Sequence, residues 1–313
     1  MSKLGIVGLG RVGSQILTDI QNLNLFAEII LIDTNKEVAS GEALDHSHIQ
    51  GLSNSTNIDI RVGDYQELAD ASFIIIASSA PTDPNEGDRV LLAQDNRQMI
   101  EGVMAQIQQV TQEAIVILIS NPVDTITYIA NRFDYPAHKL IGTGTSLETS
   151  RFKTLIAKHY KIDPKNVEAF VIGEHGQHAV PVWSKVRIHG MALDEFEALT
   201  DVPEIDKANI TAKIDQVSMD VFYQKGWTNA AISKVTVNII QAIALNQRSI
   251  IPLTTINYEF GLTDSAFSLP TLIDKEGVIQ RFEIKLNQSE WIQLKAAHQY
   301  IKQTIKQVSK TDK

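Results

Sequence analysis

The sequence predicts an α/β protein: a Rossmann-type doubly wound parallel sheet, followed by an α+β domain with antiparallel strands and long helices. In the first half, short apolar runs alternate with helix-like stretches, a pattern typical of parallel strands joined by crossover helices. After Gly142 the composition changes to stretches rich in small and β-branched residues and to long helical regions. We therefore expect two domains, residues 1–142 and residues 143–313.

Composition limits the possible classes of protein. The 313 residues are 43% hydrophobic and 21% charged, enough to bury a sizeable core, so disorder is not expected. The net charge of −9, with scattered basic residues, argues against nucleic-acid binding. The absence of cysteine excludes disulfides, thiolate nucleophiles and cysteine-ligated zinc, and no metal site is predicted. Because the sequence shows neither a signal-peptide pattern nor an apolar stretch that could span a bilayer, we expect a cytoplasmic protein without membrane contact.

A glycine-rich turn near the N-terminus predicts a dinucleotide site. It lies between an expected strand over residues 3–7 and an expected helix over residues 12–25, and a second strand over residues 28–32 ends at an aspartate. The glycines allow a tight turn, close approach to a pyrophosphate and close packing of the helix, whose N-terminus supplies free N–H groups. The aspartate can accept from both ribose hydroxyls and would repel a 2′-phosphate, so NAD is favoured over NADP. The alternative is a tight turn in an unrelated α/β protein. The expected cofactor-binding residues are Gly8, Gly10, Arg11, Val12, Gly13 and Asp33.

Two further strand ends carry candidate site residues. The polar segment over residues 78–88 follows an expected strand over residues 73–77, and loops at the carboxyl ends of parallel strands border the ligand crevice. This segment is a candidate lid and Arg89 a candidate electrophile; the alternative is a solvated loop with an arginine at a helix start. Asn121 follows a later strand and can donate to a substrate oxygen or to the nicotinamide. The alternative is a helix cap, a task that Asp124 could also perform.

The second half carries residues suited to proton and carboxylate chemistry. His175 lies in the turn Gly173-Glu174-His175-Gly176, and an imidazole moves its proton easily near neutral pH; the alternative is a structural histidine. Glu148 and Arg151 are three residues apart and share a helix face. They form either a solvated ion pair or an arginine that grips a substrate carboxylate beside a glutamate that orients a histidine. Thr228 lies where a long helical region is interrupted and could project into a pocket.

Taken together, these motifs resemble the L-lactate/L-malate dehydrogenase family over nearly the full length of the chain. Within the family the chain looks most like the L-2-hydroxy acid dehydrogenases of lactic acid bacteria, including the L-2-hydroxyisocaproate type, whose long loop also ends in Gly-Asp-Arg. The residues that carry the resemblance are Gly8-Leu9-Gly10-Arg11-Val12-Gly13, Asp33, Gly87-Asp88-Arg89, Ser120-Asn121-Pro122-Val123-Asp124, Gly142-Thr143-Gly144-Thr145, Arg151, Gly173-Glu174-His175-Gly176 and Lys225-Gly226-Trp227-Thr228.

The resemblance implies an NAD-dependent enzyme that reversibly reduces a 2-keto acid to the L-2-hydroxy acid. It makes His175 the proton donor to the ketone, and it makes Arg151 the group that holds the substrate carboxylate. Arg89 would arrive with the closing loop and polarise the carbonyl. Asn121 would bond the reacting oxygen or its neighbours, and Thr228 would line the side-chain pocket. The resemblance also implies a homodimer or a homotetramer.

Three departures from the family pattern bear on substrate and regulation. The family has aspartate where this chain has Glu148, and we expect the longer carboxylate still to pair with His175 in a shifted geometry. The loop over residues 78–88 is longer than in typical lactate dehydrogenases, so the specificity position lies among residues 81–85, none of which is arginine. Because malate dehydrogenases use an arginine there, a monocarboxylate is favoured, either pyruvate or a 2-ketoisocaproate-like acid with a bulkier side chain.

The third departure concerns fructose-bisphosphate activation. In activated lactate dehydrogenases an arginine and a histidine serve this effector, and the matching positions here are Lys153 and Glu168. An acid should repel a phosphate, so no activation is expected.

Four other interpretations compete. They are a lactate dehydrogenase strict for pyruvate, a malate dehydrogenase, an NAD-dependent glycosidase, and an NAD-binding sensor that lost turnover through Glu148. Glycosidases of this fold use cysteine and histidine at a metal site, and this chain has no cysteine. The joint presence of His175, Arg151 and Arg89 argues against a sensor.

Overall fold

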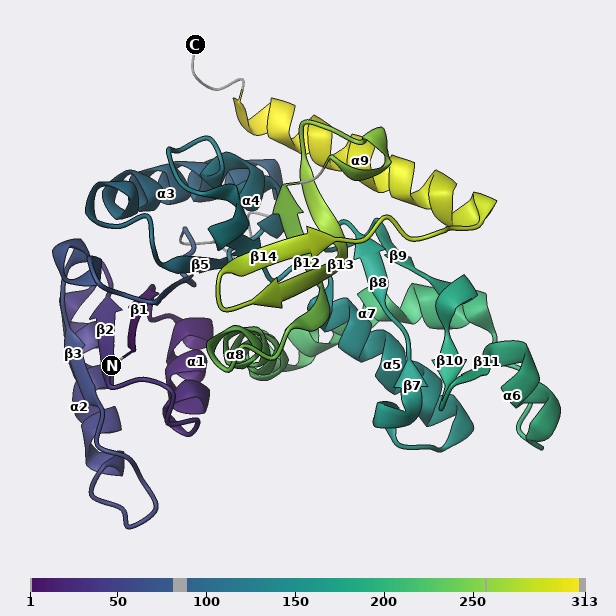
Figure 1. Cartoon of the computed structure of the whole chain (residues 1–313), viewed down its shortest axis with the longest axis horizontal. Coiled ribbons are helices and arrows are strands. Elements are labelled where there is room, and N and C mark those ends of the chain that lie inside the picture. The colour runs from purple at the N-terminus through teal and green to yellow at the C-terminus, as the bar shows by residue number, and fades with distance from the viewer. Residues whose placement is uncertain (1, 81–88, 257, 310–313) are drawn as a thin grey trace.

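A computed structural model describes residues 2–80, 89–256 and 258–309, with only the main chain described for residues 89–92. Within this part of the chain, one 11-stranded sheet runs through the molecule, with helices on both of its faces (Figure 1). A small lobe with its own three-stranded sheet lies at the end far from the N-terminus.

The first half forms the parallel part of the large sheet, in the order β3-β2-β1-β4-β5-β6. Its strands are β1 (Lys3–Val7), β2 (Glu28–Ile32), β3 (Asp59–Val62), β4 (Phe73–Ile76), β5 (Ile115–Leu118) and β6 (Leu140–Gly142). Most are short runs of Val, Ile and Leu that are buried along nearly their whole length, as expected for strands covered on both faces. This confirms the doubly wound parallel sheet.

Helices cover both faces because alternate strand side chains point to opposite sides. Leu4 and Ile6 of β1 join a core with one helix layer, whereas Val7 joins the core beneath the other. The first layer contains α1 (Arg11–Gln21) and α8 (Ala230–Ala244), and the second contains α3 (Arg89–Val110) and α4 (Val123–Ala130). Helix α2 (Lys36–Ile49) begins at Asn35, whose side chain accepts from two free N–H groups of the first turn.

The sheet does not end with the parallel strands. Strand β12 pairs antiparallel with β6, where Thr254 lies opposite Gly142, and four more antiparallel strands continue from there. These strands are β12 (Ser249–Ile256), β13 (Ala266–Asp274), β14 (Gly277–Arg281), β8 (Val171–Gly173) and β9 (Ala179–Pro181). The antiparallel strands expected for the second half are confirmed, and they belong to the same sheet as the parallel ones.

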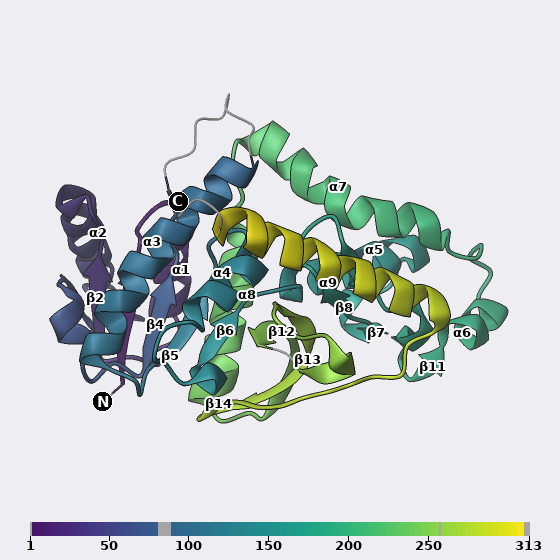
Figure 2. The same cartoon turned by 90° about the horizontal axis from the view of Figure 1, so that it is seen from above.

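The far lobe and the long helices complete the second half. The small sheet consists of β7 (Val167–Glu168), β10 (Arg187–Ile188) and β11 (Met191–Ala192). The remaining helices are α5 (Ser146–Tyr160), α6 (Leu193–Leu199), α7 (Lys207–Lys225) and α9 (Gln288–Ser309). Figure 2 shows α9 crossing from α3 and α4 toward the far lobe, with α5 and α7 beyond it.

Boundaries differ from expectation by a few residues. The helix expected over residues 12–25 is Arg11–Gln21, whereas the strands over residues 3–7 and 28–32 are as predicted. Short 3₁₀ turns occupy Tyr65–Leu68, Ala137–Lys139, Pro164–Asn166, Trp183–Lys185 and Glu259–Gly261. Across the described residues, no helix has the length and apolar character needed to cross a membrane.

Candidate active site

A cleft of about 770 Å³ opens at the carboxyl ends of β1, β2 and β4, where the glycine turn lies. Gly8 adopts a φ of +94°, and an added Cβ would stand 2.3 Å from the Ser78 nitrogen. At Gly13 a Cβ would stand 2.0 Å from the Gly8 carbonyl oxygen, so the start of α1 packs against the turn too closely for any side chain. A Cβ on Gly10 would meet nothing within 4 Å, which leaves the main chain open to a ligand in the cleft.

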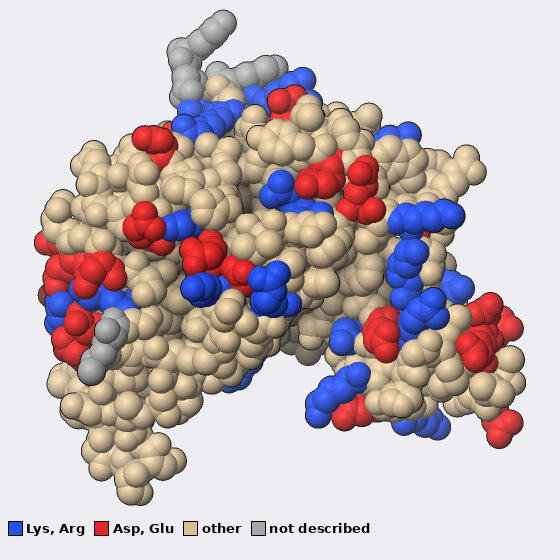
Figure 3. Space-filling model, viewed as in Figure 1, with Lys and Arg blue, Asp and Glu red and all other residues tan. Residues whose placement is uncertain are grey.

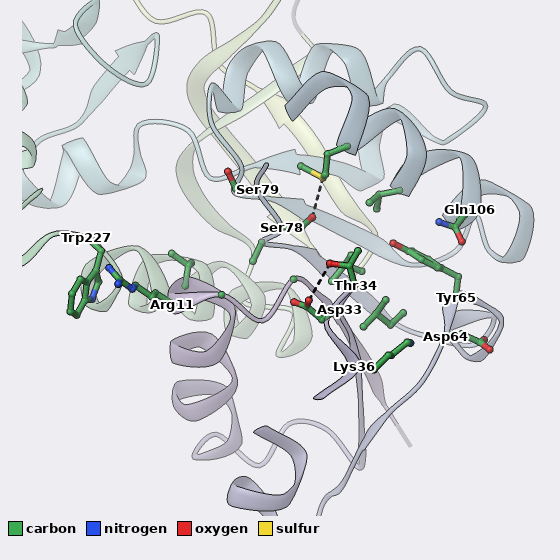
Figure 4. Close-up of a pocket in the computed structure, with 18 of the residues that line it drawn as sticks. Arg11, Asp33, Thr34, Lys36, Asp64, Tyr65, Ser78, Ser79, Gln106 and Trp227 are labelled. Carbon is green, nitrogen blue, oxygen red and sulfur yellow. Dashed lines mark hydrogen bonds between the residues drawn. The ribbon is translucent and has the colours of Figure 1, made fainter. Parts of the chain in front are cut away.

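Asp33 is fixed in the wall of this cleft by two main-chain donors. Its carboxylate accepts from the Leu9 N–H at 2.7 Å and from the Asn35 N–H at 2.8 Å. These bonds hold an acid beside the glycine turn, as ribose recognition requires. Figure 4 shows Asp33 and Thr34 in the middle of the cleft, with Tyr65 toward one end. The residues present therefore fit a dinucleotide.

The break between α7 and α8 lines the other end of the cleft. The Trp227 ring lies under the Arg11 guanidinium, with 3.7 Å from the guanidinium carbon to the ring centroid (Figure 4). Thr228 lines the same cleft, as expected from the interruption in the helical pattern. The side chain of Asn229 donates to Gln15 of α1 at 3.2 Å, so the break is tied to α1 at two points.

The histidine, the glutamate and the arginine predicted from the second half lie together. The Nδ1 atom of His175 is 3.0 Å from Oε2 of Glu148, and Oε1 of Glu148 accepts from Nη1 of Arg151 at 3.1 Å. Glu148 lies in the first turn of α5 and is only 2% exposed, so the solvated surface pair considered for Glu148 and Arg151 is wrong. One buried carboxylate thus touches both an imidazole and a guanidinium.

The outer faces of these two basic groups stay accessible. The His175 side chain is 21% exposed and that of Arg151 is 14% exposed, so a small ligand can reach both. Nη2 of Arg151 is held by the Ser218 hydroxyl of α7 at 3.3 Å. This leaves a fork of N–H donors next to an imidazole, which suits a ligand that has a carboxylate beside a carbonyl oxygen.

The surrounding charges control the proton on the imidazole. Burial alone would lower the pKa of His175, but the charge and hydrogen bond of Glu148, with the charges of Asp124 and Glu174, raise it to about 9. Burial alone would raise the pKa of Glu148, but His175 and Arg151 hold it below its usual range. The imidazole is therefore protonated at neutral pH and is available as an acid.

Two predicted residues have a less complete description. Arg89 is the first residue of α3, but its side chain lies outside the described residues, as do residues 81–88. Asn121 stands between β5 and α4, and its carbonyl accepts from the Asn96 side chain at 2.7 Å. The helix-cap alternative is not supported, since the residue at the N-cap of α4 is Pro122. Among the described residues, no group of three or more metal-ligating side chains could hold a metal ion.

The sequence does not predict two contacts near this site. It offers Asp124 as a helix cap and as part of the motif over residues 120–124, yet the carboxylate accepts from the His175 main-chain N–H at 2.7 Å. It offers Trp227 as part of the motif over residues 225–228, and nothing in its spacing indicates the contact with Arg11. The useful signal for Asp124 was its position just after a parallel strand, where ligand-site residues gather.

The fold combines a cleft that fits a dinucleotide with a protonated imidazole and a guanidinium held by one buried carboxylate, the groups that suit hydride transfer to a 2-keto acid. The protein is an oxidoreductase of the NAD-dependent 2-hydroxy acid dehydrogenase class.

Comparison with known proteins gives the family. Residues 2–142 match the family model for the lactate/malate dehydrogenase NAD binding domain, and residues 145–311 match that for the alpha/beta C-terminal domain. The chain therefore belongs to the lactate/malate dehydrogenase family, which confirms the resemblance seen in the sequence.

Individual relatives agree along nearly the whole chain. An L-lactate dehydrogenase 2 of Clostridium acetobutylicum is 37% identical, over 97% of both chains. An L-lactate dehydrogenase of Selenomonas ruminantium is 34% identical, over 97% of this chain and 96% of its own. Among solved structures, a lactate dehydrogenase from a deep-sea metagenome library of the Medee basin superposes with a TM-score of 0.92, at 28% identity over 98% of this chain and 99% of that chain. The minor L-lactate dehydrogenase of Enterococcus mundtii gives 0.91, at 27% identity over 97% and 98%.

Proposed function

We propose that the protein reduces a monocarboxylate 2-keto acid, pyruvate or a 2-ketoisocaproate-like acid, to the L-2-hydroxy acid with NADH, and catalyses the reverse reaction. The observation that carries the proposal is the bridge made by Glu148, which contacts Nδ1 of His175 at 3.0 Å and Nη1 of Arg151 at 3.1 Å. This bridge fixes the proton donor relative to the group that binds the carboxylate. Three of the four similar proteins are named L-lactate dehydrogenases and the fourth a lactate dehydrogenase, which supports pyruvate as the first substrate to test.

In the proposed mechanism Arg151 holds the substrate carboxylate through two parallel hydrogen bonds. His175 then points its second nitrogen at the substrate carbonyl and gives its proton to the oxygen as the carbonyl carbon is reduced. Glu148 fixes the tautomer of the ring and stabilises its charged form. When bound, the reduced nicotinamide supplies the hydride. Arg89 and Asn121 would polarise the carbonyl from the loop side.

The cofactor would lie along the glycine turn. Gly10 leaves room for the pyrophosphate at the start of α1, where the Arg11 and Val12 main chain begins the helix, while Gly8 allows the tight turn and Gly13 the close packing of the helix against it. Asp33 would accept from the ribose hydroxyls. We keep the division into residues 1–142 and 143–313, the first unit for the cofactor and the second for His175, Glu148 and Arg151. Thr228 would line the substrate side-chain pocket.

A second copy of the chain is the proposed partner, in a homodimer or a homotetramer. Val38 and Leu44 of α2 and Leu52 of the following loop are 42%, 61% and 59% exposed, which is unusual for large apolar side chains so close together in the chain. Figure 3 shows no charged residues on the visible face of the lobe formed by the end of α2 and this loop. Sedimentation velocity tests the proposal: a dimer or a larger species is expected, and a monomer at micromolar concentration contradicts it.

Substrate choice is tested by comparing kcat/KM for pyruvate, 2-ketoisocaproate, phenylpyruvate and oxaloacetate with NADH. We expect the best monocarboxylate to exceed oxaloacetate by at least about 100-fold, because an unpaired second carboxylate is costly to bury. Preference for oxaloacetate would mean a malate dehydrogenase and would overturn the proposal. Activity on pyruvate alone would favour the strict lactate dehydrogenase.

A further inference from the structure

We propose that Asp124 is a positioning residue for His175, which fixes the main chain of the histidine turn and stabilises the charged imidazole independently of Glu148. The inference rests on the proposed role of His175 as proton donor. Asp124 is the second residue of α4 and is 3% exposed. Because α4 follows β5 in the cofactor-binding half, this carboxylate would link the two halves of the enzyme at the reacting group.

Both carboxylate oxygens of Asp124 accept hydrogen bonds from residues outside α4. Oδ2 accepts from the main-chain N–H of His175 at 2.7 Å, and Oδ1 accepts from the Thr254 hydroxyl of β12. Neither donor belongs to α4, so the aspartate is not a cap for its own helix. Its contacts fasten the turn that carries the imidazole to the start of α4.

The same carboxylate begins a buried chain of hydroxyl groups. The Thr254 hydroxyl lies 2.8 Å from that of Ser268 on β13, and Ser268 accepts from the Thr145 N–H at 2.9 Å. Thr254, Ser268 and Thr145 are each 0% exposed, so water does not replace any of these bonds. Thr145 immediately precedes α5, the helix that carries Glu148 and Arg151. Asp124 therefore connects the turn that carries His175 to the start of the helix that carries Glu148 and Arg151.

Among the described residues, three carboxylates act on the charge of the imidazole. Glu148 from α5 bonds the ring and is itself bound to Arg151, and Asp124 from α4 bonds the His175 main-chain N–H. Glu174 precedes His175 in the turn, where its Oε2 accepts from the His178 N–H at 2.8 Å. Burial and the charge of Glu174 raise the pKa of Asp124 to about 7, despite its bonds from Thr254 and His175. Asp124 is thus charged at pH 8 to 9, where His175 loses its proton, and its charge there favours the imidazolium.

The test is the exchange Asp124→Asn, which keeps an acceptor for the His175 N–H and a group of similar size but removes the charge. Asp124→Ser is a second uncharged variant, should the first not fold. Thr127→Val is a matched control, because it removes an uncharged buried polar group from the same helix, a hydroxyl that donates to the Val123 carbonyl. The His175 pKa is measured by NMR on ¹⁵N-histidine-labelled protein, with His175→Asn to assign the resonance. The pH profile of kcat/KM for pyruvate reduction is measured alongside.

We expect the uncharged variants to bind the His175 proton about tenfold more weakly and to lose activity at a pH about one unit lower than the wild type. Thr127→Val should leave both quantities unchanged. A His175 pKa in Asp124→Asn equal to that of the wild type would overturn the inference, and so would an equal shift in Thr127→Val. If the wild type itself reduces no 2-keto acid, the proposed function fails, whereas the NMR titration still decides the role of Asp124.

Discussion

Glu148→Gln offers the sharpest test of how this site holds its proton. The amide is nearly isosteric with the carboxylate and can still accept from Nδ1 of His175, but it carries no charge. Glu148 supplies the largest of the effects that raise the pKa of His175 to about 9, while burial opposes them. We therefore expect the pKa of His175 in the variant to return to about 6.5, its ordinary value.

The magnitude follows from this change in pKa. A change of about 2.5 units is a roughly 300-fold loss of proton affinity, or about 3 kcal/mol. At pH 8 the protonated fraction of His175 falls from about 0.9 to about 0.03, so protonation alone lowers kcat/KM for reduction about 30-fold. At pH 5.5 the ring is protonated in both proteins. Any loss of kcat/KM that remains there measures the weaker interaction of residue 148 with Arg151.

The assay is the oxidation of NADH with pyruvate from pH 5.5 to pH 10. Because the reduction needs a protonated imidazole, its rate should fall as the pH rises through the pKa of His175. The fall should lie near pH 9 in the wild type and near pH 6.5 in the variant. A variant whose rate still falls near pH 9 would refute the reasoning, since the proton would then be held by other groups. Thermal unfolding of both proteins shows whether the variant is folded.

Three further predictions follow from local geometry. Glu148→Asp, which restores the residue of the family, should leave kcat/KM for pyruvate equal or improved; a collapse of activity would show that the pairing with His175 is wrong. In Gly13→Ala the added Cβ would stand 2.0 Å from the Gly8 carbonyl oxygen. The exchange should therefore weaken NADH binding, measured by the fluorescence of the cofactor, and lower the free energy of unfolding by about 2–4 kcal/mol. Fructose bisphosphate should not change the rate at low pyruvate, given Glu168 and Lys153; rate curves with and without the effector check this, and a lowered KM would contradict it.

Local patterns predicted the cofactor half of the molecule well. A short apolar run after the glycine turn is enough to predict the strand over residues 28–32 and the aspartate that follows it. The structure confirms the bounds of this strand. The proximity of Glu148 and Arg151 follows from helical spacing alone. Helical spacing does not predict the contact of Glu148 with His175, because no local rule relates a turn to a helix 27 residues away; the resemblance names His175 as the partner.

Long-range contacts escaped prediction for the same reason. Nothing near Asp124 in the sequence indicates that its oxygens bond the His175 N–H, 51 residues on, and the Thr254 hydroxyl, 130 residues on. The continuation of the sheet from β6 to β12 likewise depends on a pairing between Gly142 and Thr254 that only the assembled fold produces. The stacking of Arg11 on Trp227 joins α1 to the break between α7 and α8 in the same way.

The most direct test of the catalytic arrangement is a crystal structure of the complex with NADH and oxamate, which resembles pyruvate in shape and charge. Our account predicts that the oxamate carboxylate forms two hydrogen bonds with Arg151 and that its amide oxygen lies within about 3 Å of the free ring nitrogen of His175. Oxamate bound away from Arg151, or a His175 ring turned away from that oxygen, would contradict it.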